Sequence, residues 1–141
     1  MWPNTFRDRL AAWHSLRQDC KTGDLESCVF RINQWWFNCP WSPYYLHWDD
    51  QEKWPDPWQL LDDNIFCPLA RALGIVYTCV LVERQDLQDC ELSESSGDNL
   101  VLINNGKYIL NWDPGSIVNI NPEVTVSGRR LKQQEIAVKL L

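Results

Sequence analysis

The chain has 141 residues, of which 45% are hydrophobic and 23% are charged, and its formal net charge at pH 7 is −6. This composition is typical of a globular domain, and the acidic balance argues against binding to nucleic acid or to an anionic membrane surface, since both require a basic face. The sequence contains neither the pattern of a secretion signal nor the roughly 20 consecutive apolar residues of a membrane-spanning helix, so we expect neither secretion nor membrane insertion.

Two helices are predicted in the first third of the chain. The first runs from Phe6 to about Cys20, and Thr5 is a suitable N-cap for it. The second runs from Leu25 to Phe37, with Asp24 as its N-cap and apolar residues at helical spacing. Pro40 prevents its continuation.

Tryptophan is concentrated near the start of the chain, because eight of the nine tryptophans lie within the first 58 residues. Several belong to the segment from Pro40 to Pro57, PWSPYYLHWDDQEKWPDP, in which prolines and aromatic residues alternate with acidic ones. Proline fixes the backbone, and tryptophan is too large and apolar to remain in a mobile loop. We therefore predict an ordered, irregular segment that packs over the helix that follows it.

A further helix is predicted from Pro68 to Leu73, with Gly74 ending it. The next run, IVYTCVLV from Ile75 to Val82, is rich in β-branched residues, which predicts a strand covered on both faces. The stretch from Glu83 to Gly97 is acidic and rich in serine, so we expect a surface loop there.

A β-hairpin is predicted next. Two apolar runs, Leu100 to Ile103 and Tyr108 to Leu110, flank Asn104-Asn105-Gly106, and Asn-Gly between such runs is a strong hairpin signal. Asp113-Pro114-Gly115 predicts another turn, followed by a short strand from Ile117 to Ile120. Helices followed by strands predict an α+β fold, in which N-terminal helices pack on a small antiparallel sheet.

The sequence divides into one domain, residues 1–121, and a C-terminal tail or arm, residues 122–141. The tail contains an alternating run at residues 124–126 that is typical of an edge strand, then basic residues, then apolar ones. Such a segment cannot bury its own apolar face. We expect it either to return to the domain or to dock on another protein.

Cys67 is the first candidate for a chemical role. Pro68 suits the first position of a helix, which places Cys67 at the N-cap, where free N–H groups and the helix dipole favour a thiolate. The six cysteines are otherwise expected to be reduced structural thiols, because disulfide frameworks are typical of small secreted domains. No metal or cofactor is expected, since no C-x-x-C pair occurs and no histidine lies at zinc-finger spacing from a cysteine pair.

The order of these features resembles the transglutaminase-like branch of the papain-like superfamily. The matching residues are Cys67, the ARALGI run at Ala70–Ile75, the hairpin glycine Gly106 and the turn Asp113-Pro114, and together they span about Trp58 to Ser116. The resemblance implies that Cys67 takes the place of the nucleophile. It also implies that Asp113 takes the place of the residue that orients a catalytic histidine.

The histidine of that arrangement is absent from its expected place. The position falls near Gly97, Asp98 or Asn99, and none of these side chains can act as an imidazole base. We therefore predict a transglutaminase-like core that has lost catalysis. The alternative is an active cysteine peptidase or acyl transferase in which His47 serves Cys67 as the base.

The remaining features predict a protein-binding role. Tryptophan and arginine are enriched at binding hot spots, and the candidate residues are Trp35, Trp41, Trp48, Trp54, Arg129 and Arg130. The WPDPW motif and the aromatic and acidic segment around it also resemble small proteins of tailed bacteriophages, particularly phages of cyanobacteria. That resemblance implies a virion component of the neck, tail or baseplate, located in the virion or the host cytoplasm. A phage protein that binds and modulates a host protein is the other alternative.

Overall fold

The computed structural model describes residues 2–42, 46–95, 97–118 and 128–140, and it has an α+β fold, as predicted. Helices dominate the N-terminal part: α1 (Phe6–Asp19), α2 (Leu25–Phe37), the 3-10 helix η1 (Trp48–Lys53), α3 (Pro57–Asp63) and α4 (Pro68–Val82). The rest of the chain contains the strands β1 (Cys90–Ser95), β2 (Asp98–Ile103), β3 (Tyr108–Asp113), β4 (Ser116–Val118) and β5 (Arg129–Lys132). A short 3-10 helix, η2 (Gln85–Leu87), precedes these strands, and two short helices, α5 (Gln133–Ile136) and η4 (Ala137–Leu140), follow them.

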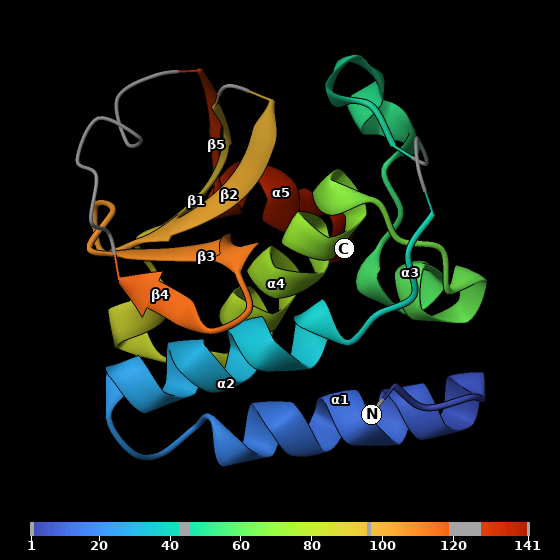
Figure 1. The fold of residues 1–141 in the computed structure, drawn as a ribbon, viewed down its shortest axis with the longest axis horizontal. Helices are drawn as coiled ribbons and strands as arrows, with labels where there is room; N and C mark the ends of the chain where they lie inside the picture. The colour runs from blue at the N-terminus through green and yellow to red at the C-terminus, as the bar shows by residue number, and fades with distance from the viewer. Residues whose placement is uncertain (1, 43–45, 96, 119–127, 141) are drawn as a thin grey trace.

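The first two helices form where the sequence predicts them. The hydroxyl of Thr5 accepts a hydrogen bond from the Asp8 N–H at 3.1 Å, and the carboxylate of Asp24 accepts one from the Ser27 N–H at 2.9 Å. These bonds satisfy N–H groups that have no partner inside the helix. Figure 1 shows α1 and α2 lying side by side along one edge of the molecule.

Helix α4 is the centre of the fold. It packs against α1, α2, α3 and α5, and on its other side against strands β1, β2 and β3 (Figure 1). Most of its side chains are buried as a result. Within the described part of the chain, neither this helix nor any other is long and apolar enough to cross a membrane.

The strand predicted from Ile75 to Val82 is wrong, because these residues continue α4. A helix that is covered on all sides needs no polar face, so its sequence lacks the helical period that would have identified it. The β-branched residues favour a strand by only a few tenths of a kcal/mol each, and contacts with the surrounding elements outweigh that preference. Gly74 therefore lies inside the helix and does not end it.

The interior contact between α2 and α4 depends on Gly74 and Thr78. A Cβ atom on Gly74 would lie 2.5 Å from two ring carbons of Trp36, so this helix position accommodates the indole ring. The Thr78 hydroxyl, which is 0% exposed, accepts hydrogen bonds from the indole N–H groups of Trp13 and Trp36, both at 2.9 Å. It donates its own hydrogen to the Gly74 carbonyl at 2.7 Å. One hydroxyl thereby satisfies two buried indoles.

The antiparallel sheet has the strand order β4-β3-β2-β1-β5. The predicted hairpin is confirmed as β2 and β3, with Val101 opposite Leu110. The predicted strand after the Asp113-Pro114-Gly115 turn is present as β4, and residues 119–120 of that prediction lie outside the described part. The loop predicted from Glu83 to Gly97 is wrong over Cys90–Ser95, which form strand β1, because the polar sequence CELSES does not show the apolar pattern of a buried strand.

The aromatic segment packs on α4, as predicted, insofar as it is described. The hydroxyl of Tyr77 donates to the Pro55 carbonyl at 2.6 Å, and Trp48 and Trp54 form an edge-to-face pair with ring centres 5.7 Å apart. Helix α3, which follows the segment, was not predicted, although Asp56 caps it and Pro57 opens it. Its length of 7 residues leaves too short a pattern to detect.

The C-terminal residues from 128 to 140 return to the domain. Strand β5 pairs with β1, with Leu131 opposite Leu92, and Ile136 of α5 is 2% exposed. Helix α5 packs on α4. The predicted boundary at residues 121–122 and the predicted edge strand at 124–126 lie outside the described residues.

Replacing Ile136 by alanine is expected to lower the free energy of unfolding by about 2–4 kcal/mol, because a buried aliphatic side chain would leave a cavity. The matched control is Val138→Ala two residues later, where a 58% exposed side chain predicts a change below about 0.5 kcal/mol. Urea denaturation followed by circular dichroism measures both. Equal, small effects would show that the tail contributes nothing to the stability of the domain.

Candidate functional site

Cys67 begins α4 in the position that the sequence predicts. It is the N-cap, with φ −111° and ψ 177°, and Pro68 is the first helical residue. Its Sγ accepts a hydrogen bond from the Ala70 N–H at 3.4 Å, and the residue is 3% exposed. The sulfur therefore caps the helix inside the core.

Asn111 of β3 joins the start of α4 to strand β2. Its Nδ2 donates to the carbonyl oxygens of Pro68 at 3.0 Å and Asn99 at 2.6 Å, and its Oδ1 accepts from Arg71 Nε. Its backbone N–H donates to Asn33 Oδ1 of α2 at 2.9 Å. A backbone φ of 69°, which asparagine tolerates better than most residues, directs the amide into this position. The side-chain amide of Asn111 thus links the start of α4 to β2, and both of its N–H groups are bonded.

The three residues predicted for catalysis are not brought together as a triad. His47 is exposed at the start of η1, and its carbonyl accepts from Trp54 Nε1 at 2.8 Å. Asp113 ends β3, and its carbonyl accepts from Asn33 Nδ2 at 2.9 Å. Within residues 2–42, 46–95, 97–118 and 128–140, no hydrogen bond joins Cys67 to His47 or to Asp113.

The expected histidine position on β2 is also bonded elsewhere. Asn99 accepts a hydrogen bond from Trp48 Nε1 on its side-chain Oδ1 at 2.7 Å, and its carbonyl is the acceptor for Asn111. An amide side chain does not take up a proton at neutral pH, so it cannot activate a thiol. Cys67 therefore acts as the N-cap of α4, and none of the described side chains is bonded to it as a base.

No family model, no curated protein and no solved structure matches this chain. The role of the site is therefore inferred from its own geometry.

Arg71, on the first turn of α4, is the charged group of this region. Its guanidinium carbon lies 3.9 Å from the centre of the Phe37 ring and 5.1 Å from the centre of the Trp41 ring. Burial lowers the pKa of Arg71, and the nearby thiol of Cys39 opposes that shift. Burial likewise raises the pKa of Cys39 to about 11, so this thiol is neutral at pH 7.

The tryptophans predicted to bind a partner differ in exposure. Trp41 is 56% exposed, whereas Trp48 and Trp54 are 6% and 5% exposed because their rings pack in the core. Trp35 is half-buried and packs against Trp2 with their rings tilted by 50° and the ring centres 4.7 Å apart. Trp41 is therefore the most exposed of these four tryptophans, whereas Trp48 and Trp54 are buried within the chain.

The two arginines predicted to bind a partner are used within the chain. Arg129 forms ion pairs with Asp49 at 2.9 Å and Glu94 at 2.8 Å, and Arg130 pairs with Glu91 at 3.4 Å. These bonds attach β5 to β1 and to η1. Exposed ion pairs of this type add little stability, and their charges are already balanced.

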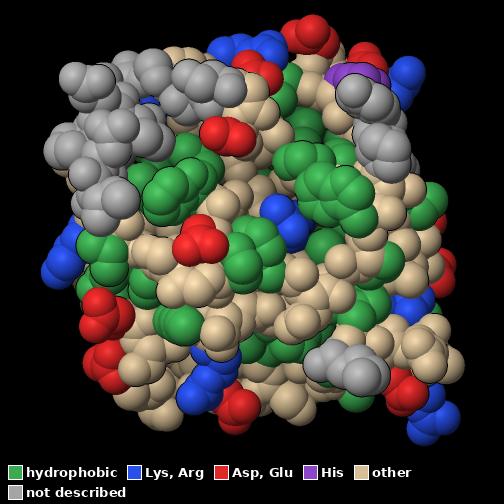
Figure 2. Space-filling view, in the orientation of Figure 1, with side chains coloured by type: hydrophobic (Ala, Val, Ile, Leu, Met, Phe, Trp, Pro, Cys, Tyr) green, Lys and Arg blue, Asp and Glu red, His purple; other side chains and the backbone are tan. Residues whose placement is uncertain are grey.

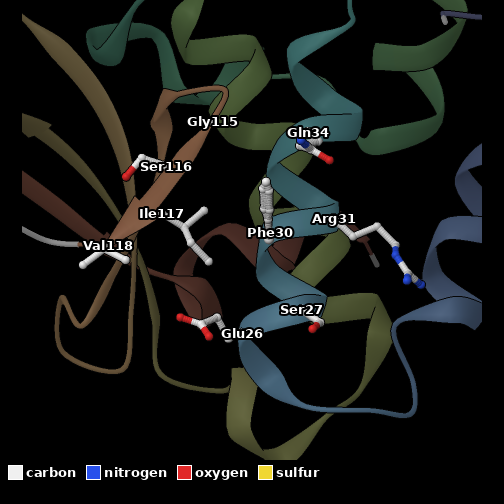
Figure 3. Close-up of a pocket in the computed structure, with 9 residues that line it drawn as sticks. All are labelled: Glu26, Ser27, Phe30, Arg31, Gln34, Gly115, Ser116, Ile117 and Val118. Atoms are coloured by element: carbon white, nitrogen blue, oxygen red, sulfur yellow. The ribbon is translucent and has the colours of Figure 1, made fainter.

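A shallow groove of about 490 Å³ lies between α2 and the edge strand β4. Figure 3 shows Phe30 and Ile117 reaching into it, while Arg31 points away from the strand. The charged residues of its lining, Glu26 and Arg31, have opposite signs and select no ligand charge. No cluster of three or more metal-ligating side chains occurs among the described residues.

Sequence reasoning missed Asn111 and Arg71, the two residues that define the site. A signal for Asn111 exists, because a lone asparagine interrupts the apolar run YILNWD. The arginine of the ARALGI run gave no such signal, since one charged residue in a helix is normally a solvated one.

Proposed function

We propose that the protein is a non-catalytic binding and assembly protein, a virion component of a tailed phage, built on a degenerate transglutaminase-like core. The observation that carries the proposal is the bonding of Cys67 and Asn99: the buried Sγ of Cys67 accepts from the Ala70 N–H, and Asn99, at the expected histidine position, is bonded to Trp48 and Asn111. A buried cysteine that only caps a helix is a structural residue.

The surface supports a binding role. Trp41 and Trp112 are 56% and 48% exposed, and tryptophan is enriched at the binding hot spots of protein interfaces. The net charge of −6 agrees with a protein partner and with the absence of a nucleic-acid role.

The test is a phage that carries Cys67→Ser. Serine is a good N-cap, so the substitution keeps the cap while it removes the sulfur nucleophile. We expect the chain to be present at a fixed copy number in purified particles of both the parent and the C67S phage, with plaque titres that agree within about twofold. Quantitative mass spectrometry of gradient-purified particles gives the copy number.

The matched control is Cys79→Ala, which alters another buried cysteine of the same helix, 2% exposed. A hundredfold loss of titre with C67S, but not with C79A, would establish a catalytic Cys67 and overturn the proposal. Recovery of the chain from the soluble fraction of infected cells, and not from particles, would instead favour a modulator of a host protein.

A further inference from the structure

Arg71 is a half-buried cation with no acidic partner among the described residues. The ion pairs of the described residues involve Arg84, Arg129 and Arg130. A charge removed from water normally has a counter-ion, because desolvation is unfavourable without one. The neutral thiol of Cys39 does not supply it. The missing negative charge therefore points to a ligand.

The guanidinium is held in place by Asn111 and by the thiol of Cys39, and its outer N–H groups have no oxygen partner among the described residues. Of its five N–H donors, the one on Nε is bonded to Asn111 Oδ1, and the four on the terminal nitrogens donate no hydrogen bond to an oxygen of the described chain. Contacts with the Phe37 and Trp41 rings restrict the plane of the group. A guanidinium fixed in this way loses little further entropy when it binds a planar anion through two parallel hydrogen bonds.

The surroundings indicate which anion fits. A single guanidinium among apolar rings matches the one charge of a carboxylate, whereas proteins usually hold phosphate groups with clusters of arginine. Trp41 offers an exposed ring for the apolar part of the same ligand. Figure 2 shows hydrophobic side chains gathered over the middle of the face that it draws, with basic and acidic side chains between them.

We propose that Arg71 binds a carboxylate of a partner protein, either a chain-terminal one or that of an acidic side chain, while Trp41 packs on the apolar group beside it. The inference deepens the proposed binding function. It rests on that function only for the claim that the carboxylate belongs to a protein. Binding of a carboxylate is measured with small organic acids. The result therefore does not depend on whether the chain is found in purified phage particles.

The experiment is an NMR titration of the full, ¹⁵N-labelled chain, in which the Arg71 Nε–H and Trp41 indole N–H signals are followed. N-acetyl-leucine presents an α-carboxylate, N-acetyl-glutamate α-amide presents a side-chain carboxylate, and N-acetyl-leucinamide is the uncharged match. We expect saturable shifts of both signals with one or both acids, with a dissociation constant on the order of a few millimolar, and none with the amide. The tighter acid identifies the source of the carboxylate.

Variants complete the test. Arg71→Gln should abolish the shift of the Trp41 signal, Arg71→Lys should weaken binding at least about fivefold because it lacks the planar fork, and Trp41→Ala should weaken binding to Arg71. Arg7→Gln, at an exposed position of α1, should bind as the parent does. If Arg71→Gln does not fold, Trp41→Ala, which changes an exposed side chain, decides the question.

Any of four results would overturn the proposal. These are no shift at about 50 mM acid, equal binding of acid and amide, unchanged binding in every folded site variant, or inorganic phosphate binding over about tenfold more tightly than both acids. Carboxylate binding by a chain that is absent from particles would refute the virion role alone. Failure to bind in a chain that is a particle component would refute the Arg71 site alone.

Discussion

Replacing Thr78 by valine is expected to lower the free energy of unfolding by about 3–5 kcal/mol, because two buried indole N–H groups would lose their acceptor at once. Valine has nearly the shape of threonine, so the packing changes little and the loss reports the hydrogen bonds. The hydroxyl is 0% exposed and accepts from Trp13 and Trp36 at 2.9 Å, so water does not replace it. Urea denaturation with an unchanged m-value measures the effect.

The control for this prediction is Thr78→Ser, which keeps the hydroxyl and removes one methyl group. Its cost should be about 1 kcal/mol, the value for a buried methyl or methylene group. If the valine and serine variants differ by less than about 1 kcal/mol, the shared hydroxyl does not hold the two indoles as described.

Replacing Gly74 by alanine is expected to destabilise the protein by about 2–4 kcal/mol, because the added methyl group would overlap the ring of Trp36. In an ordinary helix the same change stabilises by about 1 kcal/mol, so the sign of the effect is diagnostic. The Cβ would lie 2.5 Å from two carbons of a ring that is 0% exposed. Trp36 cannot retreat easily, since it packs against Trp2, Trp35 and Phe66.

A double-mutant cycle with Trp36→Phe tests the cause of that loss. Phenylalanine has a smaller ring, so the double variant should be more stable than the sum of the two single changes predicts, by about 1 kcal/mol or more. Thermal or urea denaturation of the four proteins gives the coupling energy. Simple additivity would mean that the clash with Trp36 is not what makes alanine unfavourable at position 74.

The elements with local signals were predictable. Thr5 and Asp24 mark the starts of α1 and α2, and the Asn104-Asn105-Gly106 turn marks the hairpin, because caps and tight turns require particular residue types. Helix α4 was only half predicted. A helix surrounded by other elements is apolar on every side, so its sequence cannot be distinguished from that of a buried strand by period alone.

Of the candidate site, the position of Cys67 was predictable from the sequence, whereas the roles of Asn111 and Arg71 were not. Cys67 was placed at the N-cap from Pro68 alone, since both belong to one local motif. Asn111 and Arg71 lie 40 residues apart in the sequence, and their hydrogen bond exists because β3 packs beside α4. Contacts of this kind follow from tertiary structure, which no local pattern contains.

The pairing of β5 with β1 joins strands that lie far apart in the sequence. The hairpins β1–β2 and β2–β3 join neighbours in the chain, whereas β1 meets β5 across a separation of 35 residues or more. Until residues 129–132 arrive, the outer edge of β1 has unpaired backbone N–H and C=O groups, which can pair with a second chain. Strand β5 therefore also covers an edge of β1 through which two copies of the chain could otherwise associate.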